Sequence, residues 1–124
     1  MIPTDIRLRQ KSRKLELVFE CGEIFDFSYE FLRVYSPSAE VRGHSPEQAV
    51  LQLDKVSVGV SRVDLIGSYA LKITFDDGHD TGLYSWDYLR DLHIQKERYW
   101  ATYLEKLKRE GHDRKKWLKM ADME

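Results

Sequence analysis

The sequence predicts an α+β fold, with antiparallel β-sheet hairpins, one short helix and a long amphipathic C-terminal helix. Three observations lead to this prediction. Apolar and polar residues alternate in several short runs before Ser85, which is the period of half-buried strands. Turn-forming residues such as glycine, serine and aspartate separate these runs. From Trp86 onward, the apolar residues recur at helical spacing instead.

Two hairpins are expected at the N-terminus. Apolar residues alternate with polar or charged ones over residues 6–9 and largely over 15–20, and the segment "QKSRK" between them predicts a turn. A third run, "IFDF", follows "ECGE", which places Cys21 and Gly22 at the tip of the second hairpin. Glycine suits this position because it adopts a positive φ without steric cost.

A short helix is expected after the second hairpin. Ser28 is a good N-cap for residues 29–34, and Pro37 limits how far that helix can run. The pattern from residue 36 to 52 is weak, except that "SPEQ" at residues 45–48 has the signature of a single helical turn.

Strands are predicted again by the runs "KVSVGVSRVDLIG" and "YALKITF", and the shorter run "DTGLY" completes a hairpin with the second of them. The Asp77-Gly78 step is the strongest hairpin signal in the chain. Three aspartates surround His79 here, a group that can bind a cation weakly. The favoured interpretation is a turn whose carboxylates point apart into water, because like charges repel.

One long helix is expected from Trp86 to about Glu110. Ser85 can cap it, and Gly111 provides a natural stop. The apolar positions that define its buried face are Trp86, Leu89, Leu92, Trp100, Tyr103, Leu104 and Leu107. Beyond Gly111, the basic stretch "DRKKWLKMADME" is either a final helical turn or a frayed tail.

The chain is predicted to form one domain, because 124 residues suffice for one modest core and are too few for two ordinary ones. Residues 1–95 carry 11 Lys and Arg against 15 Asp and Glu, whereas residues 96–119 carry 9 against 4. Residues 96–124 therefore form the continuation of the helix and a basic tail. Such a segment can attract a polyanion, but a solvated helix face is the favoured interpretation.

A cytoplasmic protein is expected. No apolar run approaches the roughly 18 residues that span a bilayer, and the N-terminus lacks the apolar stretch of a secretory signal. Cys21 is the only cysteine, which excludes an internal disulfide and any zinc motif built on cysteine pairs.

The sequence offers no motif for catalysis or for a cofactor, so a non-enzymatic protein is expected. It contains no G-x-S-x-G, no P-loop and no G-x-G-x-x-G. Acidic neighbours disfavour a thiolate at Cys21. None of the four histidines begins an H-x-D, H-x-E or H-E-x-x-H motif, so the usual iron and zinc sites have no signature here.

Three segments together resemble the small domain at the N-terminus of gamma-butyrobetaine hydroxylase and of trimethyllysine dioxygenase. They are "LELVFECGEIFDFSYEFLR", "LRVYSPSAEVRGH" and "IGSYALKITFDDGHDTGLYSWDYL". The resemblance covers about residues 3 to 90. The same domain also exists as stand-alone bacterial proteins and is fused to some Mrp-type iron–sulfur scaffold proteins. The resemblance implies a shared fold and a role as an attached or recruited module, since the oxygenase chemistry belongs to a separate catalytic domain.

The resemblance also bears on zinc. In the two-domain hydroxylases, three cysteines and a histidine hold a structural zinc, and the matching positions here are Ser36, Ser38, Val41 and His79. A structural zinc site needs four good nitrogen or sulfur ligands. The resemblance therefore implies that this chain folds without that zinc.

The leading hypothesis is a non-enzymatic, cytoplasmic interaction module that binds a protein partner through its hairpin face and its long helix. The candidate binding residues are Arg33, His44, Tyr69, Asp77, His79 and Trp86. No metal-ligating or catalytic residue is assigned. The long helix can also pair with its copy in a homo-oligomer, or it can fold back on its own sheet.

Two alternatives remain open at this stage. By analogy with the iron–sulfur fusions, the protein is a metal-binding accessory factor for iron or iron–sulfur traffic, with His79, His44 and nearby carboxylates as ligands. The weaker alternative is nucleic-acid binding through Lys106 to Lys119, where lysines and arginines accompany one tryptophan.

Overall fold

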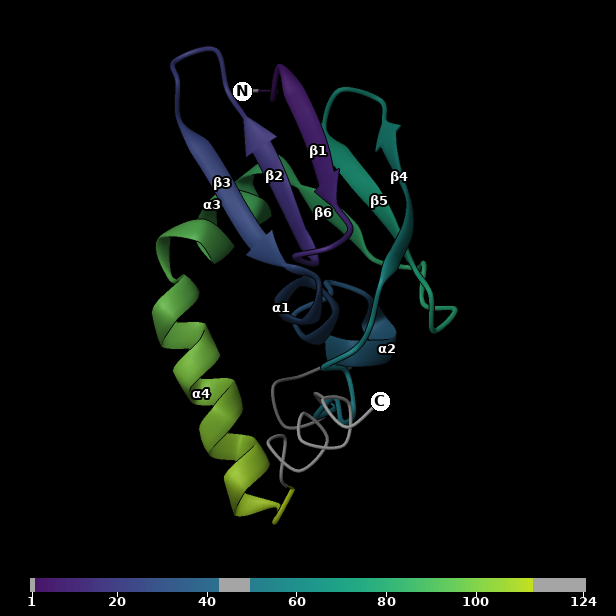
Figure 1. The fold of residues 1–124 in the computed structure, drawn as a ribbon, viewed down its shortest axis with the longest axis vertical. Coiled ribbons are helices and arrows are strands. Elements are labelled where there is room, and N and C mark those ends of the chain that lie inside the picture. Colours follow the sequence, from purple (N-terminus) through teal and green to yellow (C-terminus); the bar gives the residue numbers. More distant parts are fainter. Residues whose placement is uncertain (1, 43–49, 113–124) are drawn as a thin grey trace.

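The computed structural model describes residues 2–42 and 50–112, and it confirms the predicted α+β class. Two three-stranded antiparallel sheets lie at one end of the molecule, and helices cover the other end and one side (Figure 1). The first sheet holds β1 (Asp5–Arg9), β2 (Lys14–Val18) and β3 (Ile24–Ser28). The second sheet holds β4 (Val60–Ile66), β5 (Ala70–Phe75) and β6 (Leu83–Ser85).

The first sheet follows the predicted alternation. Ile6 pairs with Leu17, and Leu17 pairs with Phe25, so that one face of all three strands is apolar. The expected second hairpin is confirmed, because Gly22 takes a φ of 89° in the turn between β2 and β3.

The second sheet is less regular than predicted. A register shift between Val60 and Arg62 interrupts the pairing of β4 with β5. The turn after β5 is tight, since Gly78 has a φ of 91° and its N–H donates to the Phe75 carbonyl at 3.1 Å. The strand β6 begins only at Leu83, so residues 79–82 form a loop instead of continuing the hairpin.

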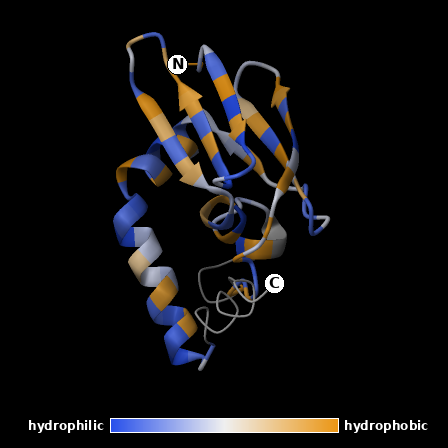
Figure 2. Cartoon of the chain, in the orientation of Figure 1, coloured by the Kyte–Doolittle hydropathy of each residue, from blue (hydrophilic) through white to orange (hydrophobic). Residues whose placement is uncertain are grey.

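One core joins the two sheets. Its fully buried members include Leu15, Leu17, Phe25 and Phe27 from the first sheet, and Leu71, Ile73, Phe75 and Tyr84 from the second. Figure 2 shows the resulting alternation of apolar and polar bands along the strands. Because each fully buried large side chain contributes about 1.5–3 kcal/mol, this shared core holds the sheets together.

The short helix α1 (Tyr29–Val34) has the predicted bounds. Its cap is also as predicted, because the Phe31 N–H donates to the Ser28 hydroxyl at 3.0 Å. A second short helix, α2 (Ala39–Arg42), has no counterpart in the sequence analysis. The helical turn expected at residues 45–48 lies outside the described residues.

The single long helix predicted from Trp86 to about Glu110 is instead two helices, α3 (Trp86–Ile94) and α4 (Lys96–Arg109). The break falls at Gln95, where φ and ψ are −104° and 17°. The buried side chains Leu89 and Leu92 of α3 have no apolar successor at Gln95 or Lys96, and Lys96 instead donates to the Asp26 carbonyl at 2.6 Å. As a result α4 projects away from the sheets (Figure 1).

The end of α4 is as expected. Gly111 has a φ of 71°, and the His112 N–H donates to the Leu107 carbonyl at 3.0 Å, which closes the helix with a left-handed glycine. The start of α3 is also as predicted, because the Tyr88 N–H donates to the Ser85 hydroxyl at 3.1 Å. Among the described residues, no helix has the length and apolar character needed to cross a membrane.

Candidate functional site

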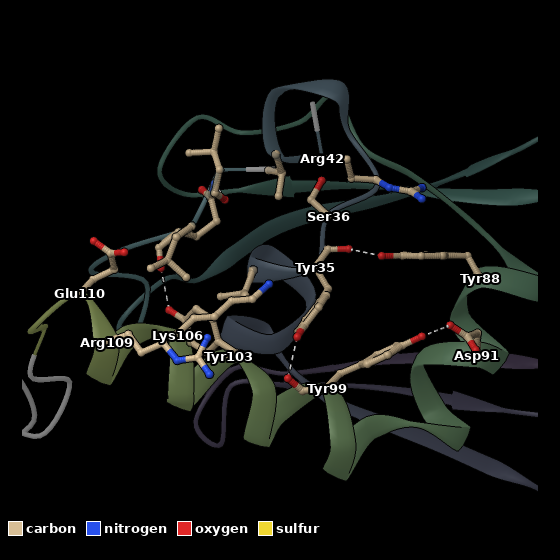
Figure 3. A pocket seen from close by; sticks show the side chains of 15 residues that line it. Tyr35, Ser36, Arg42, Tyr88, Asp91, Tyr99, Tyr103, Lys106, Arg109 and Glu110 are labelled. Atoms are coloured by element: carbon tan, nitrogen blue, oxygen red, sulfur yellow. Dashed lines mark hydrogen bonds between the residues drawn. The ribbon is translucent and has the colours of Figure 1, made fainter. Parts of the chain in front are cut away.

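A cleft of about 670 Å³ lies between α3 and α4 on one side and the end of α1, α2 and residues 50–52 on the other. One wall comes from α1 and α2, with Arg42 at its rim, and residues 50–52 close one end. The opposite wall comes from α3 and α4, which contribute Tyr88, Tyr99 and Tyr103 (Figure 3). The cleft exists because the break at Gln95 turns α4 away from the sheets.

Four tyrosines line the cleft, and each hydroxyl donates to a protein acceptor. Tyr35 donates to the Tyr99 carbonyl at 2.6 Å, and Tyr88 donates to the Tyr35 carbonyl at 2.5 Å. Tyr99 donates to the Asp91 carboxylate at 2.7 Å, and Tyr103 donates to a backbone carbonyl of the residue 50–52 segment at 2.7 Å. These bonds fix the ring positions, so the cleft walls are rigid and aromatic.

The phenols of Tyr35, Tyr88 and Tyr99 stay neutral, because the pKa of each is raised. Burial raises the pKa of Tyr88 to about 12 and also raises the pKa of Tyr35. Hydrogen bonds from Tyr99 and Gln95 lower the pKa of Asp91, so this carboxylate is charged and already accepts hydrogen bonds from both residues. None of these groups offers a free base or nucleophile at neutral pH.

The rim of the cleft carries positive charge from both walls. The Arg42 guanidinium lies 5.7 Å from the centre of the Tyr88 ring, and Lys106 extends from α4 (Figure 3). Within residues 2–42 and 50–112, neither Arg42 nor Lys106 has a carboxylate within salt-bridge distance. Arg109 also lines the cleft and pairs with Glu105 at 2.6 Å on the solvent side. Two cations are therefore available to a ligand.

A buried polar network supports the inner end of the cleft. The Arg33 side chain is 9% exposed, and its Nε donates to the Asp77 carboxylate at 2.9 Å. Its Nη1 donates to the Gln52 side chain at 3.0 Å, and the Gln52 carbonyl accepts from Tyr103. Lys55 donates to the same Asp77 carboxylate at 2.7 Å. Arg33 of α1 thus joins the turn at Asp77 to Gln52, and Gln52 in turn joins α4 through Tyr103.

Asp77 departs from the expected water-facing turn. Burial alone would raise the pKa of its carboxyl, but hydrogen bonds from Lys55, from the His79 backbone N–H and from Arg33 outweigh burial. Together they lower the pKa from 3.8 to about 2. The Asp77 carboxylate therefore pairs with two cations, Arg33 and Lys55, instead of pointing into water as expected.

His79 is buried beside this network. Its Nε2 lies 2.8 Å from the hydroxyl of Ser36, which is fully buried. The neighbouring Ser38 hydroxyl lies 2.6 Å from the Thr81 hydroxyl. A Cβ atom on Gly82 would lie 2.4 Å from the Ser36 hydroxyl oxygen, so glycine is what allows the loop to approach this closely.

These residues do not fit a structural zinc. Of the four positions that the resemblance assigns to zinc ligands, Ser36, Ser38 and His79 lie in one place. Ser36 and Ser38 supply only hydroxyls, however, and Val41 supplies a buried apolar side chain. In the part of the chain that the structure describes, no group of three or more His, Cys, Asp or Glu is placed to hold a metal ion. The described residues therefore give the metal-binding alternative no ligand set.

The predicted site residues fall into two separate groups. Arg33, Asp77 and His79 come together in the network. Tyr69 and Trp86 lie together elsewhere, at the turn between β4 and β5, where the Trp86 ring N–H donates to the Ser68 carbonyl at 2.8 Å. His44 lies outside the described residues, as does the part of the Lys106–Lys119 segment beyond residue 112.

Sequence reasoning missed most of the cleft. It did not identify Tyr35, Arg42 or Gln52, nor Lys55 of the adjoining network, whose long-range partners lie between 19 and 64 positions away in the chain. Contacts at such separations have no local signature. One signal was available, since the apolar face predicted for the helix lacks members at residues 95 and 96.

Comparison with known proteins gives one family and several related structures. Residues 6–90 match the family model described as gamma-butyrobetaine hydroxylase-like, N-terminal. Two structures solved by NMR in solution are 48% and 46% identical to the chain, each with a TM-score of 0.77. Each match covers 91% of this chain, and it covers 89% of the first structure's chain and 84% of the second structure's chain. This coverage of the chain extends beyond residues 6–90.

A third related structure is a crystal structure of a protein of unknown function from Acidithiobacillus ferrooxidans, which belongs to the DUF971 family. It is 34% identical, has a TM-score of 0.61, and covers 73% of this chain and 91% of its own. No curated protein matches the chain.

Proposed function

The chain belongs to the gamma-butyrobetaine hydroxylase-like N-terminal domain family, and from its cleft we propose that it is a non-enzymatic interaction module that binds an acidic, partly apolar segment of a partner protein. The compartment proposed for this encounter is the cytoplasm, since the chain has one cysteine, Cys21, and so uses no internal disulfide.

The observation that carries the proposal is the pairing of an aromatic interior with cations on facing walls. Arg42 and Lys106 stand on opposite sides of a cleft whose tyrosine rings are held in place by their own hydroxyls. A partner segment that inserts an apolar side chain between the rings would place its carboxylates beside both cations. Charges at the rim of an interface steer a partner of opposite charge and set specificity, while the aromatic interior supplies buried contact area.

The state of the polar groups supports binding in preference to catalysis. The tyrosine hydroxyls already donate to protein acceptors, and Asp91 is held by Tyr99 and Gln95. Such a site can recognise the shape and charge of a partner, but its hydroxyls and its carboxylate are already hydrogen-bonded and are poorly placed to transfer a proton. The family match covers residues 6–90, which is the size of one small domain, and this size suits a module that is recruited to a larger partner.

Peptide display on the purified protein tests the proposal. We expect selection from a random peptide library to enrich sequences that combine acidic with aromatic or aliphatic residues. The double variant Arg42→Glu, Lys106→Glu is expected to bind the selected peptides at least about tenfold more weakly than the wild type, because it reverses both rim charges.

A matched control separates the cleft from net charge. The double variant Lys11→Glu, Lys108→Glu changes the total charge equally, and it alters one exposed turn residue and one α4 residue that does not line the cleft. It is expected to bind like the wild type. Equal weakening in both double variants, or enrichment of peptides without acidic residues, would contradict the proposal.

A further inference from the structure

The strand β4 is an edge strand with an open side. It pairs with β5 along one edge, and among the described strands none pairs with the other edge. Figure 1 shows β4 at the margin of the molecule, and at its start the Gln10 side chain donates to the Val60 carbonyl at 3.0 Å. At seven residues it is also the longest of the described strands. An edge of this kind presents backbone N–H and C=O groups to any chain that can add a strand.

The edge of β4 is only partly protected. Proteins commonly block exposed edges with charged side chains, with proline, with bulges or with a very short strand. The sequence "VSRVDLI" of β4 has no proline and no lysine, and its two charges, Arg62 and Asp64, have opposite signs. It does have an exposed leucine, since Leu65 is 57% accessible. A bulge lies only at its start, between Val60 and Arg62.

The charges of β4 are arranged symmetrically about Val63. Arg62 precedes it and Asp64 follows it, and their side chains lie 2.9 Å apart on one face of the sheet, 72% and 35% exposed. In an antiparallel pairing of two copies centred on Val63, Arg62 of each copy lies directly opposite Asp64 of the other. We infer that β4 pairs with β4 of a second copy of this chain, antiparallel and in this register.

The charges select the register. If the two strands shift so that Arg62 of one copy faces Arg62 of the other, or Asp64 faces Asp64, like charges lie directly opposite, which is unfavourable. Shifts by one residue place each charge opposite an apolar or uncharged residue and turn the apolar set to the wrong face. Only pairing about Val63 places both pairs of opposite charges together.

The same register covers the exposed leucine. Leu65 of one copy lies opposite Ser61 of the other and diagonal to its Val63, within reach of side-chain contact in a β-sheet. The result is a continuous six-stranded sheet across the two copies. Because the contact is a single pair of strands, the area is small and a dimer in the micromolar range or weaker is expected.

Charge exchange tests the register. Wild-type protein is expected to show a concentration-dependent dimer in sedimentation equilibrium at low salt. The variants Arg62→Asp and Asp64→Arg are each expected to dimerise at least about tenfold more weakly, because each places two pairs of like charges opposite one another. The double variant Arg62→Asp, Asp64→Arg restores opposite pairs and is expected to dimerise like the wild type.

Mixing the two single variants gives the sharpest outcome. An Arg62→Asp chain carries two acidic side chains in this strand, and an Asp64→Arg chain carries two basic ones, so the mixture is expected to form heterodimers with wild-type strength. Circular dichroism checks that each exposed substitution leaves the fold intact. A wild-type monomer up to about 1 mM, or a mixture no more associated than its components, overturns the inference.

The inference does not depend on the cleft. No residue of β4 lines the cleft, so the charge variants are expected to retain peptide binding even where they lose the dimer. In the wild type, peptide binding without a dimer contradicts only the pairing of β4, and a dimer without peptide binding contradicts only the proposed function.

Discussion

The hydroxyl of Ser36 lies 2.8 Å from Nε2 of His79, although the two residues are 43 positions apart in the chain. Both residues are buried, with Ser36 fully enclosed. This hydrogen bond joins the segment after α1 to the loop between β5 and β6. The close approach of that loop depends on it, and on the absence of a side chain at Gly82.

Replacing Ser36 with alanine is expected to lower the free energy of unfolding by about 1–3 kcal/mol, because the substitution removes a partner from a buried ring nitrogen. Urea unfolding measures the loss. Ser61→Ala is the matched control, since the Ser61 hydroxyl also makes a hydrogen bond, to the Thr74 carbonyl, but is exposed. The control is expected to change stability by less than about 0.5 kcal/mol. Similar losses in both variants would argue against a special role for the buried pair.

Gly82→Ala is expected to destabilise the fold by about 1–3 kcal/mol through overpacking. Its new Cβ would lie 2.4 Å from the Ser36 hydroxyl oxygen and 3.2 Å from Pro37 Cδ, and both neighbours are held in place. At Gly59 the same substitution meets only the exposed Asp76 side chain, at 2.7 Å, which can rotate away. Thermal unfolding of both variants tests this difference. Gly82→Ala is expected to have the lower melting temperature, and the reverse order would contradict the prediction.

The Asp77 carboxylate is expected to make stability depend on acid pH. Its pKa is about 2 in the folded protein and 3.8 in the unfolded chain, so its contribution is present above about pH 4 and is lost as the pH falls through 2. With allowance for solvent screening at a side chain 24% exposed, the loss is about 1 kcal/mol. Asp77→Asn is expected to remove this component from the stability profile between pH 4 and 2. Asp80→Asn, at a more exposed carboxylate, is expected to leave it unchanged.

His93 is expected to weaken the fold as the pH falls below its ordinary value of 6.5. Burial lowers its pKa, with a further contribution from Lys96, and its ring stacks on Phe25 at 4.3 Å. Because the unfolded chain then binds more protons, stability is full above pH 6.5 and declines below it. His93→Phe keeps the stacked ring and is expected to show a smaller fall in melting temperature between about pH 7 and 5. An unchanged pH profile would show that other groups are responsible.

The position of α4 is expected to depend on the Tyr103 hydroxyl. This hydroxyl donates to the Gln52 carbonyl, and Tyr103 belongs to a small second core with Val34 and Leu107. Tyr103→Phe is expected to raise the amide hydrogen exchange of α4 by roughly fivefold, which corresponds to about 1 kcal/mol, while exchange in the sheets changes little. Equal acceleration in β2 and α4 would instead show that α4 and the sheets unfold as one unit.

Local signals in the sequence identified the elements that local chemistry determines. Ser28 and Ser85 cap their helices as predicted, and Gly22 and Gly78 take the positive φ that their hairpin turns need. The break at Gln95 was missed because helical propensity continues through it. What ends the helix there is the absence of an apolar contact, which depends on the position of the core.

The candidate site was only partly predictable for the same reason. Arg33, Asp77 and His79 were singled out from the sequence and do lie together, but their partners Gln52 and Lys55 were not. Gln52 comes from the stretch with weak patterning and Lys55 from the start of a run predicted to be a strand, and the fold alone brings them to Arg33 and Asp77. The cleft itself depends on the direction of α4, which no short segment of sequence encodes.

Every strand of the described sheets pairs with the strand before or after it in the chain. Such hairpins close in about 1–10 μs, because few residues separate the parts that meet. The first sheet can therefore be complete on a growing chain before the second has been synthesised. Until Ser85 has been added, its inner face of Leu15, Leu17 and Phe27 has no opposing sheet to cover it. Protein synthesis thus passes through a stage in which half of the future core is open to wrong contacts, and the speed of translation between Ser28 and Ser85 sets how long that stage lasts.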